Sequence, residues 1–290
     1  MSAAAAGAAD SPLAIICGSG TLPFAVADAA IKRGRKVVLF AVRGAADAVR
    51  VAGYPHQWGA LGQFGRLQRL LREAGCRDVV FIGGLVRPGF WQIRFDLKTL
   101  LLMPRIARAF RGGDNHLLSG LARIFEQHGF RLLGAHEVAP EILVPEGVIG
   151  SVAMTERDRS DVDAGLAYLR AAGPHDVGQA VVVSGGHVLA VEAIEGTDHM
   201  LARVAELRAS GRIRAPVGSG VLVKAPKPQQ DRRFDLPSIG PQTVEEVARA
   251  KLAGIAVVAG ETIIAEPQQV IAAADDAGIF VAGVRTGSAR

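Results

Sequence analysis

Residues 13–42 read LAIICGSGTLPFAVADAAIKRGRKVVLFAV, and this stretch decides the fold class. An apolar run, LAIIC, is followed by an amphipathic pattern, PFAVADAAIKRG, and then by a second apolar run, KVVLFAV. Short apolar runs joined by helices of this length are typical of βαβ units, in which the strands lie parallel. The pattern therefore predicts an α/β fold with a doubly wound, Rossmann-like parallel sheet.

The alternation continues along the chain with one change of pattern. FGRLQRLLREAG, DVVFIGGL and RLLGAHEV predict a helix and two strands, and residues 90–129 predict two or three helices. Prolines and glycines interrupt the periodicity across 140–158, which indicates a domain boundary. Beyond it, AVVVSGGHVLAVEAI predicts a hairpin turned at 184–187, followed by a strand, a helix and a strand. We expect a disordered tail at 1–11, an N-terminal Rossmann-like α/β domain at 12–145 and a C-terminal α/β domain at 155–290.

The composition narrows the classes of function. The chain has 290 residues, a net charge of +5 and an aromatic fraction of 5%. It contains no apolar run of the ~18 residues that span a bilayer. Its start, MSAAAAGAADSP, lacks the regions of a signal peptide, which favours a cytoplasmic protein. With only Cys17 and Cys76, neither a disulfide framework nor a cysteine-based zinc site is expected. The few aromatic residues disfavour nucleic-acid binding, whereas the positive charge suits anionic partners.

The stretch CGSGTLP ends the first predicted strand and opens a helix. Backbone N–H groups at such a turn can bind a phosphate, which makes four residues candidates for substrate binding: Gly18, Ser19, Gly20 and Thr21. The motif is an incomplete dinucleotide fingerprint, because Pro23 stands at the third glycine position and the second strand ends in Arg43. A tight strand-to-helix turn without a ligand is the alternative.

Polar residues also follow two later strands. His136, in GAHEV, stands where α/β folds place ligand sites, although a single histidine is often structural. In AVEAIEGTDHM, a strand over 188–194 places Glu192 among apolar neighbours, where a carboxylate has to be paired or metal-bound. The next turn offers the Thr197 hydroxyl and the Asp198 carboxylate as metal ligands, unless Asp198 only caps the following helix.

Two helix starts carry capping patterns. Asp114, in RGGDNHLL, is predicted to be the N-cap of a helix and not a ligand. The helix in TVEEVARAKLAG is predicted to begin with a capping box of Thr243 and Glu246.

Residues 224–243 read KAPKPQQDRRFDLPSIGPQT and predict an extended, rigid loop, because each proline fixes its own φ and lacks an N–H donor. Its cations can neutralise phosphates, with Lys224, Lys227 and Arg233 as the expected ligands. Asp235 instead suits Mg²⁺, which binds through one or two carboxylates plus substrate oxygens. Asp231 is interpreted as a solvated ion-pair partner. A surface ion-pair cluster is the alternative for the whole run.

Five stretches in this order, GSGTLP, GGDNHLL, GAHEV, EGTDHM and the 224–243 loop, resemble the LpxI-type UDP-2,3-diacylglucosamine pyrophosphatases of lipid A biosynthesis. The resemblance covers the chain from Leu13 to about Val284. It implies a Mg²⁺-dependent hydrolase that cuts UDP-2,3-diacylglucosamine into 2,3-diacylglucosamine 1-phosphate and UMP. It also implies two α/β domains with the ligand in the cleft between them, the C-terminal one catalytic, and a homodimer. The essential aspartate of the family's DLP-x-IG segment falls on Asp235, while Glu192, Thr197 and Asp198 are candidate metal ligands by position.

Two other functions remain open from the residues alone. An NADP-dependent oxidoreductase would use Gly18 and Gly20 around the cofactor and Arg43 on its 2′-phosphate. A non-catalytic nucleotide-binding regulator would bind the UDP-sugar without releasing UMP.

The segment 87–111 is basic and amphipathic. It carries several cations, among them Lys98 and Arg105, against the single acid Asp96, together with the apolar run LLLMP. Basic amphipathic segments can lie on anionic bilayers, and a diacylated substrate has to be taken from one. We therefore expect either peripheral contact with the cytoplasmic membrane surface or burial of the apolar side in the core or a dimer interface.

Overall fold

The computed structural model describes residues 11–84, 95–110, 114–175, 177–228, 231–234 and 236–286, and of 105–110 and 114–119 the backbone only. The expected catalytic residue Asp235 lies outside the described residues. The chain forms two compact units. Unit 1 comprises Met1–Glu141 together with Asp231–Asp235, and unit 2 comprises Ile142–Gln230 and Leu236–Arg290.

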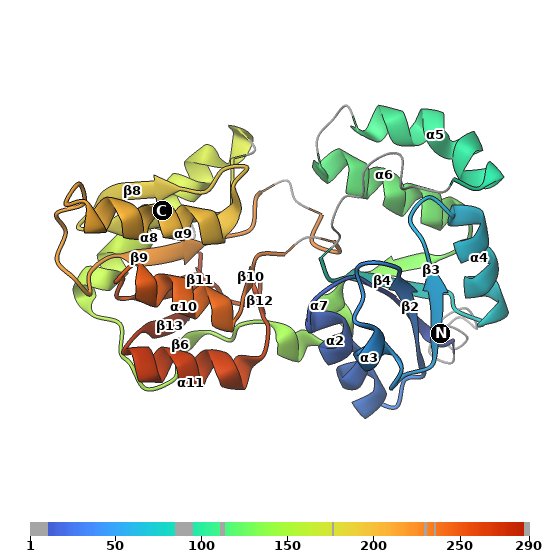
Figure 1. Ribbon diagram of the computed structural model, residues 1–290, viewed down its shortest axis with the longest axis horizontal. Coiled ribbons are helices and arrows are strands. Elements are labelled where there is room, and N and C mark those ends of the chain that lie inside the picture. The colour runs from blue at the N-terminus through green and yellow to red at the C-terminus, as the bar shows by residue number, and fades with distance from the viewer. Residues whose placement is uncertain are drawn as a thin grey trace. The chain divides into compact units, whose positions relative to one another are not determined.

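Unit 1 contains a five-stranded parallel sheet with helices between its strands (Figure 1). In chain order its elements are β1 (Leu13–Cys17), α2 (Leu22–Lys32), β2 (Val37–Val42), α3 (Ala48–Val51), β3 (His56–Gly59), α4 (Phe64–Glu73), β4 (Asp78–Ile82), α5 (Leu97–Phe110), α6 (Asp114–Gln127), β5 (Arg131–Leu133) and α7 (Ala135–Val138). The strand order is β3-β2-β1-β4-β5, and all of these pairings are parallel. This is the order of a doubly wound sheet, so the predicted fold class is confirmed.

The core of unit 1 explains why β1 is buried along its whole length. Ala14 and Ile16 pack with residues of α4, α5 and α6, the helices predicted within 64–129. Among them the rings of Phe64 and Phe125 meet edge to face, with centroids 5.1 Å apart. Helix α2 packs against β1 and β2. A strand covered by helices reads as a continuous apolar run, which is the pattern of LAIIC.

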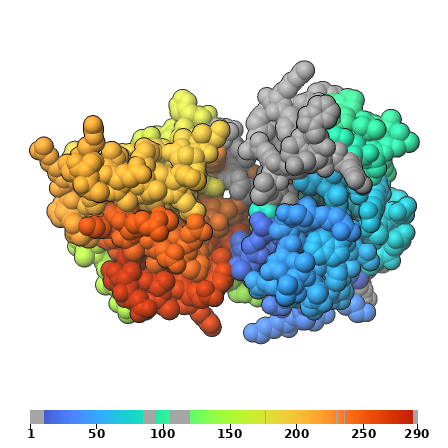
Figure 2. Space-filling view, viewed as in Figure 1, coloured from blue at the N-terminus to red at the C-terminus, as the bar shows by residue number. Residues whose placement is uncertain are grey.

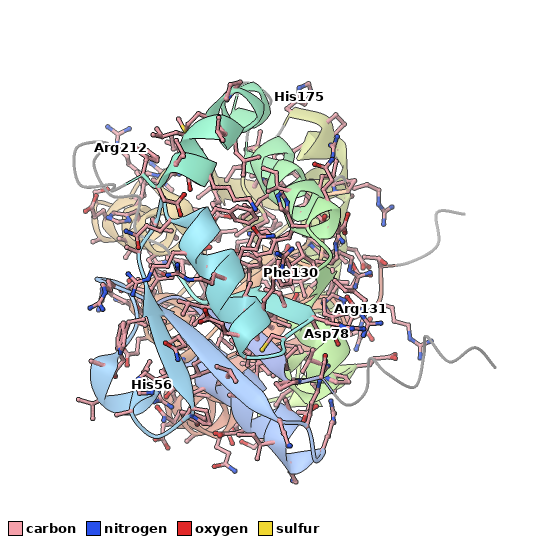
Figure 3. The ribbon with its side chains drawn as sticks, turned by 90° about the vertical axis from the view of Figure 1, so that its right-hand side faces the viewer. His56, Asp78, Phe130, Arg131, His175 and Arg212 are labelled. Atoms are coloured by element: carbon pink, nitrogen blue, oxygen red, sulfur yellow. The ribbon has the colours of Figure 1, made fainter. Side chains whose placement is uncertain are left out.

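A buried ion-pair cluster lies at the edge of the unit 1 sheet where the parallel strands begin. Asp78, the first residue of β4, is 1% exposed and accepts two hydrogen bonds of 2.8 Å from the Arg131 guanidinium. Arg35 donates a third hydrogen bond to it. Figure 3 shows Asp78 and Arg131 next to each other, and each is the first residue of its strand. The cluster lies away from the edge where α/β sheets place ligands, so its role is structural.

Unit 2 contains a six-stranded mixed sheet. Its elements are β6 (Gly147–Ile149), α8 (Glu156–Ala172), β7 (Ala180–Ser184), β8 (His187–Val191), α9 (Gly196–Ala209), β9 (Val221–Lys224), β10 (Ser238–Ile239), α10 (Pro241–Arg249), β11 (Gly254–Val258), β12 (Ile263–Ile264), α11 (Pro267–Ala277) and β13 (Phe280–Val284). The strand order is β6-β13-β11-β9-β7-β8. Strands β9, β11 and β13 are parallel, and β6, β7 and β8 pair antiparallel to their neighbours. β10 and β12 form a separate parallel pair.

Helices cover both faces of this sheet. On one face Met200, Val244 and Val270, from α9, α10 and α11, share a core with Leu222 and Val257. On the other face α8 packs against β7 and β9. Figure 1 shows α9, α10 and α11 lying next to one another, and Figure 2 shows them as yellow, orange and red bands on the surface of unit 2.

Local predictions for unit 2 were confirmed in part. The hairpin is confirmed, with Ser184 paired to His187 across the turn. The strand expected over 188–194 is wrong at its end, because β8 stops at Val191. Glu192 is therefore the first residue after the strand. Of its two expected apolar neighbours, Ala190 is buried, but Ile194 is 105% exposed.

The predicted capping box at Thr243 is wrong. The N-cap of helix α10 is Gly240, three residues before the predicted N-cap Thr243, and Pro241 is the first helical residue. A proline there has its φ already set for a helix and loses no hydrogen bond, which favours this start. Thr243 instead lies at the third position, and its hydroxyl accepts a hydrogen bond of 3.2 Å from the Gly240 N–H. Asp114 is the first residue of α6, but its side chain lies outside the described residues, so its capping role stays a prediction.

Candidate functional site

The candidate site lies at the edge of the unit 2 sheet where the parallel strands end. Lys224 is the last residue of β9 and pairs with Ala180 of β7. On the other side of Ala180, Glu192 donates its backbone N–H to the Ala180 carbonyl. Residues opposite one another on antiparallel strands point to the same face. Lys224 and Glu192 therefore flank the small Ala180 side chain on one face, and both are buried, at 6% and 8% exposure.

A threonine hydroxyl joins the two charged side chains. The Lys224 ammonium donates to Thr197 Oγ1 over 3.0 Å, and Thr197 Oγ1 donates to Glu192 Oε1 over 2.8 Å. Thr197 lies in the first turn of α9, which packs over this end of the sheet. The ammonium also donates to the Ser238 carbonyl over 2.9 Å. The site therefore draws on β9, α9, β10 and the residue that follows β8.

The second Glu192 oxygen is held by the chain beside it. The Gln179 N–H donates to Glu192 Oε2 over 2.8 Å. Gly178 lies so close that an added Cβ would be 2.4 Å from the Glu192 carbonyl oxygen and 2.5 Å from its Cγ. Only a glycine leaves this space, so the local chain is built around one position of the Glu192 side chain.

These contacts decide which predicted metal ligands fit Mg²⁺. Both Glu192 oxygens already accept protein hydrogen bonds, and the Thr197 oxygen accepts from an ammonium, so a divalent cation would have to compete with these contacts, and the metal roles of both residues stay predictions. Asp198 is exposed and accepts a hydrogen bond of 3.0 Å from the Gln242 side chain through Oδ2. An exposed carboxylate of this kind fits the one or two that Mg²⁺ takes in phosphate sites. Within the described residues no three acidic, histidine or cysteine side chains gather into a metal cluster.

The glycine turn of unit 1 is occupied by a backbone contact. The Ser19 N–H donates to the Gly84 carbonyl over 2.8 Å, and the Gly84 N–H donates back to Ser19 over 3.0 Å. An added Cβ on Gly18 would lie 2.5 Å from the Gly84 carbonyl oxygen. Gly20 has a φ of +90° and follows this contact. The glycines thus allow the chain ends after β1 and β4 to approach closely. For Gly18 and Ser19 this arrangement fits the alternative of a tight strand-to-helix turn without a ligand. Phosphate binding by Gly20 and Thr21 stays a prediction.

His136 lies in α7 at the end of β5. Burial lowers its pKa, Glu137 opposes this effect, and the nearby positive charge of Arg232 adds to it. Its Nδ1 is buried and has no hydrogen-bond partner among the described residues. A ring in this state is neutral at pH 7, so it suits a hydrogen bond to a ligand better than charge neutralisation.

The predicted loop begins directly after Lys224. Residues 225–228 have no regular structure, 232–234 form a turn, and Pro241 opens α10. The Arg233 side chain donates to both oxygens of Asp231 at 3.0 and 2.8 Å, and to Glu126 of α6 over 2.8 Å. Arg233 is therefore held by two carboxylates and anchors the turn in unit 1. Asp231 is an ion-pair partner as expected, but its side chain is only 20% exposed and therefore less solvated than predicted. The phosphate roles of Lys227 and Arg233 stay predictions.

Sequence reasoning missed three members of the site: Gly178, Gln179 and the Ser238 carbonyl. Gly178 and Gln179 precede a predicted strand and carry no chemical motif. Ser238 contributes only its backbone, for which no residue-type signal exists. Only the strand register and the hydrogen bonds of the folded chain place these residues beside Lys224 and Glu192.

Comparison with known proteins divides the chain close to the boundary between the two units. The family model described as the LpxI N-terminal domain matches residues 12–142, and the one described as the LpxI C-terminal domain matches residues 145–282. UDP-2,3-diacylglucosamine pyrophosphatase LpxI of Caulobacter vibrioides is 43% identical over 272 residues, which cover 94% of this chain and 97% of that protein. Matches of this extent to both halves leave one assignment, and the chain belongs to the LpxI family.

Proposed function

We propose that this protein hydrolyses the pyrophosphate bond of UDP-2,3-diacylglucosamine, releasing 2,3-diacylglucosamine 1-phosphate and UMP. Water would form a new P–O bond at the phosphorus on the UMP side, and the bridging oxygen would leave with the sugar phosphate. The Caulobacter relative, named for this activity, supports the proposal, as does the match of both family domains.

The observation that carries the proposal is the buried Lys224 ammonium. It lies at the carboxyl end of a parallel strand, where α/β sheets bind ligands, and it is held by Thr197 and Ser238. Phosphoanhydride cleavage needs positive charge fixed near the phosphoryl oxygens before the reaction begins. A lysine with little exposure and two defined hydrogen bonds meets this need.

We further propose that the reaction requires Mg²⁺. When bound, the cation would neutralise negative charge on the phosphoryl oxygens. Asp235 and Asp198 are the residues that would hold it, since Glu192 and Thr197 are committed to other contacts. Asp235 would also be the residue that orients the attacking water.

The test is the purified protein with UDP-2,3-diacylglucosamine and Mg²⁺ in ¹⁸O-water. We expect UMP that carries the label and unlabelled sugar phosphate, with loss of both products after chelation by EDTA. Lys224→Met should lower kcat about a hundredfold, the size of effect seen when one fixed electrostatic group is removed. Label in the sugar phosphate would place the attack on the other phosphorus. Binding of the UDP-sugar without release of UMP would support a regulator.

An NADP-dependent oxidoreductase is the second candidate from the sequence. The contact between Gly18 and Gly84 disfavours it, because protein backbone occupies the approach that a dinucleotide pyrophosphate would need. Arg43 lies over the Trp58 ring, 5.9 Å from its centroid. Titration with NADPH, followed by fluorescence, is expected to show no saturable binding in the micromolar range.

We also propose peripheral contact with an anionic bilayer through α5, and a homodimer. Leu97, Leu100 and Leu101 are 74%, 51% and 73% exposed on this helix, whereas Leu102 is in the core. Within the described residues no helix is long and apolar enough to cross a membrane. An exposed leucine stripe on a basic helix suits the surface of a bilayer that contains the diacylated substrate.

Flotation with liposomes tests this surface. We expect binding to vesicles with anionic lipid and its loss in the variant Leu97→Ser with Leu101→Ser. Light scattering of both proteins reports the oligomeric state. Loss of the dimer in the variant, with no lipid dependence in the parent, would assign the stripe to a dimer interface.

A further inference from the structure

We propose that Glu192 is a positioning residue: it fixes the Lys224 ammonium through the Thr197 hydroxyl, and it does so without binding metal. The inference rests on the proposed function, because it concerns how the cation of that site is held.

The direction of the hydrogen bonds follows from chemistry alone. An ammonium group can only donate hydrogen bonds, and an ionised carboxylate can only accept them. The Thr197 hydroxyl has one proton, and it lies 3.0 Å from Lys224 Nζ and 2.8 Å from Glu192 Oε1. Its proton must therefore point to Glu192, and its lone pairs face Lys224. The chain of donors runs from Lys224 through Thr197 to Glu192.

This direction gives Glu192 a defined task. Without an acceptor, the Thr197 hydroxyl could rotate, and its oxygen would no longer present a lone pair to the ammonium at a fixed place. The negative charge of Glu192 also polarises the hydroxyl, which strengthens its bond to Lys224. Glu192 thus acts on Lys224 from two strands away, across Ala180.

The surroundings of Glu192 show that its position is specified. Its Oε2 accepts the Gln179 N–H over 2.8 Å, and Gly178 leaves room for its side chain where a Cβ would collide. A carboxylate with 8% exposure and both oxygens engaged has no room for the octahedral shell of Mg²⁺ without breaking these contacts. A buried charge is costly unless it is paired or hydrogen-bonded, and here each Glu192 oxygen accepts a hydrogen bond from a protein donor.

The position of Lys224 is thereby fixed from two sides. Thr197 holds it from α9 and Ser238 holds it from β10. A long, flexible lysine carries much rotamer freedom, and within the described residues the Thr197 and Ser238 acceptors restrict it before substrate binds. Loss of one acceptor should therefore lower kcat more than it raises KM, because the charge remains but its position does not.

The experiment compares five variants of the full-length protein: Glu192→Gln, Thr197→Val, Thr197→Ser, Lys224→Met and, as a matched control, Glu195→Gln. Glu195 lies in the same turn but pairs with Arg203 at the surface. We expect kcat to fall about tenfold in Glu192→Gln and more in Thr197→Val, with KM nearly constant. Thr197→Ser restores the hydroxyl and should recover most of the loss. Glu195→Gln should match the parent.

Two readouts do not depend on turnover. The first is the ¹⁵N signal of the Lys224 ammonium, assigned by its absence in Lys224→Met. We expect this signal to exchange faster with water in Glu192→Gln and Thr197→Val but not in Thr197→Ser. The second is Mn²⁺ binding by electron paramagnetic resonance, which should be equal in Glu192→Gln and the parent.

A double-mutant cycle separates positioning from general damage. If Glu192 acts through Lys224, adding Glu192→Gln to Lys224→Met should cost little further activity, since the group that it positions is gone. Additive losses, or an unchanged Lys224 signal, would overturn the inference. A Mn²⁺ affinity lowered about tenfold or more in Glu192→Gln would assign it to metal binding instead. Inactivity of the parent protein would refute the proposed function, whereas an active parent with an insensitive Glu192 would refute only this inference.

Discussion

Two buried charged residues, one in each unit, are assigned different roles: Lys224 is proposed to act in the chemistry, whereas Asp78 stabilises the fold. Lys224 and Asp78 are both buried charged residues, at 6% and 1% exposure. Lys224 lies where the strands of unit 2 end, next to a hydroxyl and a carbonyl. Asp78 lies where β4 begins in unit 1 and is neutralised by two guanidinium groups. The two residues are similarly buried, and they differ in whether they lie at the end or at the beginning of a parallel strand.

Asp235→Ala is expected to separate turnover from binding. By its resemblance to the essential aspartate of the family, Asp235 should act on metal or water in the transition state. Its removal should lower kcat by about a hundredfold or more, the cost of one electrostatic group. The cations nearby should still hold the substrate, so mass spectrometry of ligand extracted from the purified variant should find the intact diacyl UDP-sugar.

The comparison for this variant is Asp231→Ala. Asp231 accepts three hydrogen bonds from Arg233, including one from its backbone N–H, so its loss should loosen the turn and lower kcat less than the loss of Asp235. Equal losses in the two variants, or near-normal turnover in Asp235→Ala, would contradict the assignment.

Asp78→Asn is expected to destabilise unit 1 by about 2 kcal/mol, because it leaves two guanidinium groups without a counter-charge. Burial alone would raise the pKa of Asp78, but hydrogen bonds from Arg131 and Arg35 outweigh this effect and lower it. The stability that Asp78 contributes is therefore fully present above the unfolded pKa, about 3.9, and is lost as the pH falls through the lower folded pKa. Urea unfolding from pH 7 to pH 3 measures it. A difference between parent and variant that stays constant below pH 4 would disprove the mechanism.

Among the elements, the ends of β1 and β4 show that the glycines of one motif can serve a backbone contact. The GSG turn has the glycines of a phosphate-binding loop, yet Ser19 and Gly84 exchange two backbone hydrogen bonds there. Gly83 has a φ of +99° and would place a Cβ 2.7 Å from the Ser19 carbonyl oxygen. Glycines are needed on both chains because their backbones touch.

Gly18→Ala should therefore destabilise the protein by several kcal/mol, on the order of an overpacked core position, since its Cβ would meet backbone atoms that cannot move aside. The matched control is Gly59→Ala in β3 of the same sheet, where nothing lies within 4 Å of an added Cβ. Thermal unfolding followed by circular dichroism compares them. Equal melting temperatures would show that the contact between the two strand ends can relax.

Across the complete chain, the two units have separate cores, and the segment Asp231–Asp235 belongs to unit 1. Unit 2 supplies the chain on both sides of this segment, which itself belongs to unit 1. Phe234 packs in the unit 1 core beside Phe81, with ring centroids 5.6 Å apart. Part of the loop expected to carry the chemistry therefore packs in unit 1, although the chain before and after it belongs to unit 2.

Fragments of the chain test this arrangement. The fragment 142–286 contains a complete sheet with helices on both faces, so it should unfold cooperatively by itself. The fragment 12–141 contains the complete parallel sheet but lacks Phe234 and Arg233, and it should melt at a lower temperature than the same unit in the full chain. A non-cooperative transition in the fragment 142–286 would show that unit 2 needs unit 1 to fold.

The sequence by itself determined the fold class, the hairpin at 184–187 and the membership of Lys224, Glu192 and Thr197 in one candidate site. These features depend on periodicity and residue type, which are local properties that a few neighbouring positions encode. The same reasoning failed at the start of α10, where Pro241 prevailed over the capping pattern of Thr243.

Only the tertiary structure shows which groups each candidate site residue contacts. Lys224 and its acceptor Thr197 are 27 residues apart, and Arg233 and Glu126 are 107 apart. Hydrogen-bond partners at such separations depend on strand register and helix placement, which no local pattern encodes. Glu192, for example, was predicted from the sequence as a metal ligand, and only the structure shows that it accepts a hydrogen bond from the Thr197 hydroxyl. Which oxygen faces which donor is fixed by the pairing of β8 and β9 with β7 and by the packing of α9 against β8.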